Sequence, residues 1–455
     1  MAKLSPDWNN EAYVSLHLVQ TILEMAGLPR KSSYSHWIPE FKLKVPRLIA
    51  NGQIVWTQKE VDFLVEDLSR YINFLVEIKT AKTKLDAAAR IQLETYLKYS
   101  RTRFGILIDP FSVEIYEYTE GLATLKCKHN IENPEQVQPV ANFVRFFLDT
   151  IKMRTIAIYT AKGGVGKTTL VVNIAYELAK IGNRVLVVDL DEQANASLSL
   201  GVNKADELDR ATNLKDFVHI LDSFKNRKEL IEFLEDCEED GFSYKEYIQP
   251  SSLNEILSLS HGTKGKIDVL PSSYKTKDSS ILKLGVYCNN KLDKALWKSG
   301  LSKDYEYVII DTPPTMTTVT QNGLIAAQYV IIPSQMEYLS VYAIRKPIKN
   351  AEEIHDNTDG KRGNIIGIIP MMVENVKLHT TIKALVSKVF RDIPLLLEIK
   401  RATAVGQASH ERKPLSLFAE HNRTASSVAA QFSTLTKQIV NQIDNLERNS
   451  SKQHG

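Results

Sequence analysis

Cysteine and long apolar runs are both scarce in this 455-residue chain. The three cysteines, Cys127, Cys237 and Cys288, lie far apart and form no CxxC pair, which argues against a disulfide framework or a structural zinc site. No run of about eighteen consecutive apolar residues occurs, and the first residues lack the pattern of a secretory signal. The sequence therefore predicts a soluble protein of the cytoplasm.

An excess of charge is also missing, because 57 Lys and Arg stand against 54 Asp and Glu, a balance of +3. This balance and an apolar content of 43% exclude a charged tail and general disorder. A chain of this length is expected to form at least two cores. We place a domain boundary near residue 150, after the polar stretch CKHNIENPEQVQP, and expect domains at residues 1–150 and 151–455.

Strands and helices alternate after that boundary, which predicts an α/β domain with a mostly parallel sheet flanked by helices. The strand expected at residues 155–160 is followed by AKGGVGKTTLVVNIAYELAKIG, a glycine-rich turn that opens into an amphipathic helix. Glycines let the backbone turn tightly, so that successive N–H groups and the helix N-terminus can hold a phosphate. Lys167 is placed to hold the β and γ phosphates, Thr168 to ligate Mg²⁺, and Thr169 to hold the α-phosphate end. The loop residues expected to bind ATP are Gly163, Gly164, Val165, Gly166, Lys167, Thr168 and Thr169.

The loop departs from the usual phosphate-loop pattern at its start. Ala161 stands where a glycine is usual, and a second lysine, Lys162, begins the run KGGVGKT. In this the loop resembles the deviant Walker A loop of the ParA and MinD family of dimeric ATPases. The resemblance covers about residues 153–443. It implies an ATP-dependent homodimer in which Lys162 crosses the interface to the partner's nucleotide.

Two further motifs follow in the order of that family. RVLVVDLDEQANASLSLG places Asp189 and Asp191 on one face at the carboxyl end of a strand, where phosphate chemistry occurs in open parallel sheets. The resemblance implies that Asp191 positions the attacking water. YEYVIIDTPPT resembles the strand that ends in the Walker B aspartate, here Asp311, which holds Mg²⁺ through water. We expect Thr168, Asp189 and Asp311 to form the metal site.

The segment QYVIIPSQMEYLSVYAI resembles the strand of the family that ends near the base. The resemblance implies that Pro333, Ser334 and Gln335 touch adenine. Further along, Met371 and Met372 stand where several relatives carry an asparagine that reads adenine. The two methionines are equally compatible with simple packing.

The C-terminal region is the basic part of the chain, because residues 377–455 hold 12 Lys or Arg and 6 Asp or Glu. Basic residues that neutralise phosphates give sequence-independent, salt-sensitive DNA binding. The region also resembles ParA, which implies that the ATP-bound dimer binds nonspecific DNA, associates with the nucleoid and has a ParB-like partner. The expected DNA-binding residues are Lys400, Arg401 and Lys413.

Membrane binding through a basic amphipathic C-terminal helix, as in the MinD branch, is the alternative. Apolar residues recur here at helical spacing, but the tail carries few basic residues and ends in polar ones. We therefore expect a helix that packs on the core, and no membrane partner. Its apolar positions are Phe432, Leu435, Ile439, Ile443 and Leu446.

The N-terminal domain has no counterpart in ParA proteins. VDFLVED is an alternating strand that contains Asp62, and YINFLVEIKTA is a strand that places Glu77 and Lys79 on the same face. The helix DAAARIQLETYLKYS then projects Gln92 and Tyr96 from one side, because they are four residues apart. Two carboxylates and a lysine that converge from adjacent strands can bind a hard divalent cation and activate a water against a phosphodiester.

The order of these residues resembles the PD-(D/E)xK nuclease fold, and most closely the N-terminal nuclease domain of type I restriction motor subunits. Glu11, on an early helix, would match the extra acid of that domain. The resemblance implies catalytic roles for Asp62, Glu77, Lys79 and Gln92, with the metal held by Asp62, Glu77 and Glu11. The domain is thus expected to be a nuclease-like α/β fold.

Two functions fit these patterns. In the first, a ParA-like ATPase that dimerises on ATP and binds DNA controls a Mg²⁺-dependent nuclease, a pairing that suits defence against foreign DNA. In the second, the ATPase partitions or positions a plasmid or chromosome, and the N-terminal domain is a DNA or partner adaptor that does not cut. The metal-binding residues favour the first, and the ParA-like C-terminal region favours the second.

Overall fold

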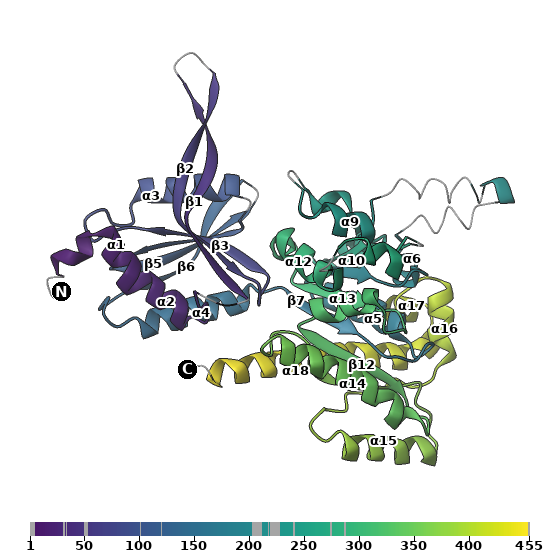
Figure 1. Cartoon of the computed structure of the whole chain (residues 1–455). Coiled ribbons are helices and arrows are strands. Elements are labelled where there is room, and N and C mark those ends of the chain that lie inside the picture. Colours follow the sequence, from purple (N-terminus) through teal and green to yellow (C-terminus); the bar gives the residue numbers. More distant parts are fainter. Residues whose placement is uncertain are drawn as a thin grey trace. The chain divides into compact units, whose positions relative to one another are not determined.

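The computed structural model of the protein divides into two compact units (Figure 1). The N-terminal unit is Met1–Met153 with Gly300–Lys303, and the C-terminal unit is Arg154–Ser299 with Asp304–Gly455. The division falls close to residue 150, where the sequence analysis expects it. The structure describes residues 5–453 except 31, 33, 50–52, 101, 120, 203–211, 217, 219–227, 240–241, 274 and 286–287.

The N-terminal unit contains a six-stranded sheet in the order β1-β2-β3-β4-β5-β6. The β3 and β4 strands are parallel because helix α3 connects them, and the other neighbours are antiparallel. The strands are β1 Ser35–Leu48, β2 Ile54–Asp67, β3 Ile72–Ile78, β4 Phe104–Asp109, β5 Ser112–Thr119 and β6 Leu122–Asn130. The helices are η1 Pro6–Asn9, α1 Glu11–Val14, the π-helical η2 Ser15–Gln20, α2 Thr21–Met25, α3 Ala87–Ser100 and α4 Gln138–Thr150.

Helices cover both faces of this sheet. Alternate strand residues such as Phe74 and Val76 pack against the helices near the N-terminus and against α4. The intervening residue Leu75 faces the other way and packs with Leu93 and Leu97 of α3. Glu77 continues the side of Leu75, so the sheet presents Glu77 toward the face that α3 covers.

The C-terminal unit contains a seven-stranded sheet in the order β13-β12-β7-β11-β8-β10-β9, parallel except for the short β9. This confirms the expected α/β domain with a mostly parallel sheet. The strands are β7 Arg154–Ile158, β8 Arg184–Asp189, β9 Gln249–Pro250, β10 Lys266–Leu270, β11 Tyr307–Asp311, β12 Tyr329–Gln335 and β13 Asn364–Met371. All five residues of β11 are buried, as expected for a parallel strand covered on both faces.

The helices of the C-terminal unit lie on both faces of its sheet. They are α5 Lys167–Lys180, α6 Asn195–Ser199, α9 Leu230–Asp236, α10 Leu253–His261, α11 Asp278–Leu282, α12 Lys291–Lys298, α13 Thr318–Ala326, α14 Ser340–Asn357, α15 Lys377–Val389, α16 Thr403–His410, α17 Leu415–Ala419 and α18 Ser426–Gln453. Short 3₁₀ turns are η3 Tyr244–Glu246, η4 Cys288–Asn290, η5 Leu301–Lys303 and η6 Arg423–Ala425. Ile309 packs with α5 and α18 in one core, whereas the next residue, Ile310, lies against Gly323 of α13 on the opposite face.

The C-terminal helix α18 packs on the core, as its apolar spacing predicts. Phe432, Leu435, Ile439 and Ile443 are buried in the same core as α5, and Leu446 packs against it. A helix whose apolar face is already covered has no free stripe to bury in a lipid surface. In the part of the chain that the structure describes, no helix is long and apolar enough to cross a membrane.

Candidate nucleotide and metal sites

The phosphate loop connects β7 to α5 at the carboxyl edge of the parallel sheet. Gly164 and Gly166 have positive φ angles of 71° and 99°, a conformation that glycine adopts without a Cβ clash. A Cβ at Gly166 would also lie 2.9 Å from the terminal methyl of Met371. Val165 turns inward and is buried in the core, so it anchors the loop while the glycines around it stay open.

Lys167 is the first residue of α5 and is buried. Burial lowers the pKa of its ammonium group, and the charges of Asp311 and Asp191 act in the opposite direction. The lysine therefore lies within electrostatic range of both acids at the mouth of the loop. A cation held there, at the N-terminus of α5, is placed to meet the negative charge of a phosphate.

Thr168 and Asp311 form a direct contact, because the hydroxyl of Thr168 donates to Oδ2 of Asp311 over 2.7 Å. The other oxygen, Oδ1 of Asp311, is buried and has no hydrogen-bond partner. Burial and the nearby charge of Asp189 raise the pKa of Asp311 well above its usual value. A buried carboxylate oxygen without a partner, beside a threonine hydroxyl, suits a hard cation such as Mg²⁺.

Asp189 is used differently from the expected metal ligand. Its Oδ2 accepts from both the backbone N–H and the hydroxyl of Ser197, each over 2.8 Å, and its Oδ1 accepts from the N–H of Asp191 over 3.1 Å. Burial raises the pKa of Asp189 to about 6 despite these bonds. Asp189 thus holds the chain after β8, and the Asp191 carboxylate accepts from the N–H of Gln193 over 3.0 Å.

Lys162 is half-exposed at the edge of the loop and contacts two residues at and after the end of β12. Its Nζ lies 2.8 Å from Oε1 of Gln335 and 2.7 Å from Oε2 of Glu337. The sequence analysis did not single out Glu337. Its place two residues after Gln335, at the carboxyl edge of the same sheet, is the signal that could have found it.

The segment expected to touch adenine ends against the phosphate loop. The side-chain amide of Gln335 contacts the carbonyl oxygen of Gly164 over 3.4 Å and Sδ of Met372 over 3.1 Å. Pro333 and Ser334 are buried within β12. Of the three, Gln335 therefore reaches the loop, and its role toward the base stays a prediction.

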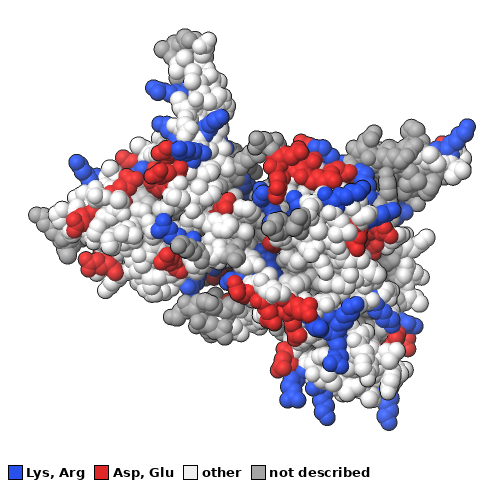
Figure 2. Space-filling view, in the orientation of Figure 1, with Lys and Arg blue, Asp and Glu red and all other residues white. Residues whose placement is uncertain are grey.

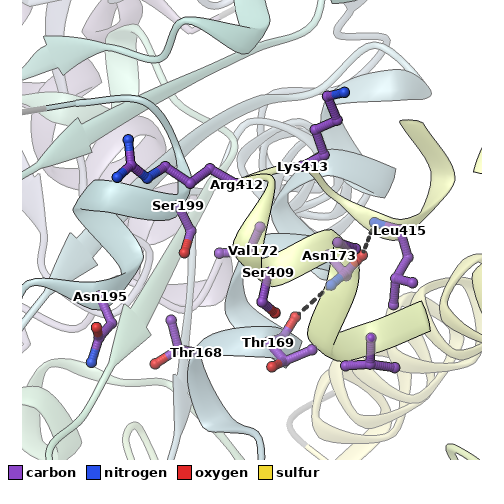
Figure 3. A pocket seen from close by; sticks show the side chains of 12 residues that line it. Thr168, Thr169, Val172, Asn173, Asn195, Ser199, Ser409, Arg412, Lys413 and Leu415 are labelled. Atoms are coloured by element: carbon purple, nitrogen blue, oxygen red, sulfur yellow. Dashed lines mark hydrogen bonds between the residues drawn. The ribbon is translucent and has the colours of Figure 1, made fainter. Parts of the chain in front are cut away.

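A pocket of about 270 Å³ adjoins the first turn of α5 (Figure 3). The side chain of Asn173 closes one wall, because it donates to the carbonyl of Thr169 over 2.8 Å and accepts from the N–H of Leu415 over 2.7 Å. Its lining is Thr168, Thr169, Val172, Asn173, Asn195, Ser199, Val405, Ala408, Ser409, Arg412, Lys413 and Leu415. Sequence reasoning singled out only the two threonines and Lys413 among these residues.

The three expected DNA-binding residues do not form one uniformly free basic surface. Arg401 pairs with Glu374 over 3.1 Å, and Lys413 pairs with Glu411 over 2.9 Å. Lys400 is exposed beside Arg401. Their affinity for DNA stays a prediction, because each ion pair must open before its cation can meet a phosphate.

A second polar cluster lies on the α3 face of the N-terminal unit. Lys79 Nζ lies 2.8 Å from Oε1 of Glu77, and the side-chain amide of Gln92 donates to the same oxygen over 2.9 Å. Lys79 also donates to Oε1 of Gln92 over 3.4 Å, and Gln92 contacts the hydroxyl of Tyr96 over 2.7 Å. The structure thus brings together the strand pair and the helix pair of residues that sequence analysis selected.

Asp62 lies beside this cluster, because its Oδ2 accepts from the backbone N–H of Ile78 over 2.6 Å. Burial and the charge of Glu77 raise the pKa of Asp62 to about 7, and Glu11 adds to the increase. Burial lowers the pKa of Lys79, but Glu77, Asp62 and Glu11 together raise it above its usual value. The cluster therefore combines crowded acids with one cation.

Neither expected set of three metal ligands is assembled as predicted. Among the described residues, no group of three or more His, Cys, Asp and Glu side chains is placed to hold a metal ion. The prediction that Asp62, Glu77 and Glu11 form one cage is therefore wrong for this structure, although Glu11 is close enough to influence Asp62. What remains is Oε2 of Glu77, which is buried without a partner and is open to a cation.

Comparison with known proteins places the similarity in the C-terminal unit. Residues 153–362 match the model of a family described as "AAA domain". The sporulation initiation inhibitor protein Soj of Bacillus subtilis is 29% identical over 275 residues, which is 60% of this chain and 94% of that protein. The chromosome-partitioning ATPase Soj of Thermus thermophilus is 27% identical over 291 residues, 62% of this chain and 97% of that protein.

Among solved structures, the septum site-determining protein MinD of Pyrococcus horikoshii, complexed with Mg-ADP, has a TM-score of 0.46 and 20% identity. The match covers 63% of this chain and 96% of that one. Homologues of the ParA and MinD type bind ATP together with Mg²⁺. Over its C-terminal part, the chain is therefore homologous to the ParA/MinD-type P-loop ATPases.

Proposed function

We propose that the C-terminal unit is a Mg²⁺-dependent ATPase that closes into a homodimer on ATP and binds DNA without sequence preference. The observation that carries the proposal is the contact of Thr168 with Asp311 at the foot of the loop, which leaves a buried carboxylate oxygen open. In this role Lys167 holds the β and γ phosphates, Asp191 orients the attacking water and Lys162 reaches the nucleotide of a second copy. Bound Mg²⁺ supplies neutralisation of the phosphate charge.

The N-terminal unit is, in this proposal, a nuclease that cuts DNA. Glu77, Lys79 and Gln92 share hydrogen bonds beside Asp62, in the order and on the elements of the PD-(D/E)xK fold. Glu77 and Asp62 would hold the metal, whose chemistry is the activation of water and the neutralisation of the phosphate. Lys79, positioned by Gln92, would hold a proton next to the attacked phosphodiester.

A partition ATPase with a non-cutting N-terminal unit is the second candidate. The observation that favours it is similarity to chromosome-partitioning proteins over the C-terminal unit, together with the absence of a three-ligand cage among the described residues of the N-terminal unit. Both candidates share the ATPase, the dimer and the DNA surface with Lys400, Arg401 and Lys413. They differ only in whether Glu77 and Lys79 do chemistry, and the first candidate suits defence against foreign DNA.

The experiment that separates them is plasmid cleavage by the full-length protein with Mg²⁺ or Mn²⁺, with and without ATP. Glu77→Gln keeps the size and the hydrogen-bonding capacity of the side chain but removes its charge, so it should abolish cutting if Glu77 holds the metal. Lys79→Ala should do the same. Glu135→Gln, an exposed carboxylate elsewhere in the unit, serves as the matched control and should cut normally.

Three results decide the outcome. Cutting that Glu77→Gln and Lys79→Ala both abolish, with Glu135→Gln unaffected, supports the nuclease. No cutting by the native protein, together with ATP-dependent retention of DNA, supports the partition ATPase. Cutting that survives in both active-site variants would indicate a contaminating nuclease and remove the proposal for this unit.

A further inference from the structure

The β1–β2 hairpin extends well beyond the sheet that anchors it. Residues of β2 pair with β3 only from Phe63 to Asp67, whereas β1 and β2 continue to pair from Phe41 opposite Val61 out to Leu48 opposite Ile54. We call residues 41–48 and 54–61 the arm. Figure 1 shows this two-stranded ribbon projecting from the N-terminal unit. An antiparallel ribbon that packs on no third strand is marginal by itself, so its retention needs a reason outside the fold.

The arm is rich in exposed positive charge. Lys42, Lys44, Arg47 and Lys59 are exposed, against the single acid Glu60, a balance of 4 − 1 = +3. In the part of the chain that the structure describes, none of these four cations forms an ion pair. Figure 2 shows Lys and Arg side chains standing out along the ribbon. Charges of one sign without partners repel each other, and a polyanion would relieve that repulsion.

Apolar side chains are exposed on the same arm. Trp56 is 59% exposed, and its ring meets Tyr99 of α3 edge-on, with centroids 6.1 Å apart. Ile54 is 65% exposed. By contrast, Leu43 and Val45 are buried against α3, which fixes the base of the arm. The arm therefore has a fixed inner side and an outer side that combines cations with an aromatic ring, the combination that DNA-contacting surfaces use.

The position of the arm relates it to the proposed nuclease site. Asp62 is the residue that directly follows the arm on β2, and Trp56 lies six residues earlier on the same strand. Six residues of strand span about 20 Å, a little over half of the roughly 34 Å turn of duplex DNA. The major groove of a duplex is wide enough to admit a two-stranded ribbon. A duplex whose phosphodiester reached Asp62 would thus run within reach of the arm.

We infer that the arm is a binding site for double-stranded DNA, with Lys42, Lys44, Arg47 and Lys59 on phosphates and Trp56 in contact with the groove. This inference rests on the proposed function for its purpose, which is to position a duplex at Glu77 and Lys79. DNA binding by the arm does not itself need metal or ATP. It can therefore be tested when cleavage is absent.

The test is binding of the full-length protein to a 24-bp duplex and to one of its single strands, by fluorescence anisotropy. ATP is omitted so that the C-terminal unit does not contribute, and a chelator prevents cutting. The arm variant is Lys42→Gln/Lys44→Gln/Arg47→Gln. The matched control is Arg345→Gln/Lys346→Gln/Lys349→Gln, which removes the same charge from three exposed positions of α14.

The arm variant is expected to bind the duplex at least about tenfold more weakly. The slope of its affinity against salt should fall by about 3, close to one unit for each phosphate that the variant no longer neutralises. Trp56→Ala should weaken binding with the slope unchanged, because it removes no charge. The control variant should bind as the native protein does. Circular dichroism checks that the variants are folded, as expected for exposed positions.

Other outcomes have definite meanings. Equal duplex binding and an equal salt slope in the arm variant would overturn the inference, as would failure of the native protein to bind duplex without ATP. Single-strand binding as tight as duplex binding would overturn the assignment to a duplex. Loss of binding in the arm variant, with no cleavage by the native protein under any condition, would support the arm and reject the nuclease.

Discussion

Lys162 forms an ion pair with Glu337 of its own protomer, with 2.7 Å between Nζ and Oε2. The side chains are 44% and 57% exposed, so the pair contributes at most about 1 kcal/mol. If Lys162 reaches a nucleotide in a second copy, this ion pair must open first. A weak pair of this kind biases the lysine without locking it.

Replacing Glu337 by Gln is therefore expected to favour the ATP-bound dimer by up to about fivefold, because 1 kcal/mol corresponds to that factor. Sedimentation velocity with ATP, at several protein concentrations, measures the dimer fraction. Glu353→Gln, which breaks the exposed pair of Glu353 with Lys349, is the control and should leave the dimer unchanged. A weaker dimer in Glu337→Gln would show that Glu337 contributes to the interface instead.

The two lysines of the loop should separate binding from dimerisation. Lys167→Ala removes the buried cation at the phosphate site and should lower ATP affinity at least about 100-fold, since each 1.4 kcal/mol is a factor of ten. Lys162→Ala should keep ATP binding but abolish the ATP-dependent dimer and turnover. Nucleotide titration and a phosphate-release assay check both. Normal turnover in Lys162→Ala would remove its proposed role across the interface.

Asp311→Asn is expected to raise the melting temperature of the metal-free protein by about 2–4 °C for each 1 kcal/mol gained. Burial and Asp189 raise the pKa of Asp311, so the fold disfavours its charged form. A raised folded pKa costs stability as the pH rises through and above the ordinary value of an aspartate, and a neutral amide avoids that cost.

The same variant should lack the added stability that Mg²⁺ gives to the ATP-bound protein, because an amide does not supply the negative oxygen. Differential scanning fluorimetry with ATP, with and without Mg²⁺, measures this difference. A Mg²⁺-dependent increase of unchanged size in Asp311→Asn would place the metal elsewhere.

Glu114 should stabilise the N-terminal unit in a pH-dependent way. Burial alone would raise the pKa of Glu114, but hydrogen bonds from Arg90, Lys128 and Tyr116 lower it to about 2. A lowered folded pKa gives stability that is present above the ordinary value of 4.5 and is lost as the pH falls toward 2. Glu114→Gln should therefore cost about 1–2 kcal/mol at pH 7, discounted because Arg90 and Lys128 are partly exposed.

Urea unfolding of the native protein and Glu114→Gln at pH 7 and near pH 3 measures the difference. The gap between them should narrow at the lower pH. A gap of the same size at both values would show that the side chain acts by packing and not by charge.

Periodicity predicted those parts of the fold that depend on local pattern. The spacing of Phe432, Leu435 and Ile439 predicted a helix against the core because steps of three or four residues place side chains on one face. Glu77 and Lys79 were assigned to one face for the same reason with a two-residue step, and the structure brings them together. Glycine-rich turns between a strand and a helix are equally local, so the phosphate loop could be recognised from its residues alone.

Contacts between distant segments were not predictable in this way. The pairing of Lys162 with Glu337 joins positions 175 residues apart in the chain, and no spacing rule relates them. The length of the arm was missed because the run from Ile54 to Glu60 is mostly exposed and lacks the apolar alternation that marks a half-buried strand. Asp189 was expected at the metal because its position on the strand follows from the sequence, whereas Ser197, which occupies one of its oxygens, depends on the course of the following turn.

The unpartnered oxygens of Glu77 and Asp311 have a joint consequence for the living cell. Each belongs to a different unit, and each unit would gain stability from a divalent cation by mass action, without any message passing between the two. The concentration of free magnesium would then set the resistance of both units to unfolding and proteolysis together. Starvation for this ion would shorten the lifetime of the whole protein, since a chain is degraded from whichever unit opens first.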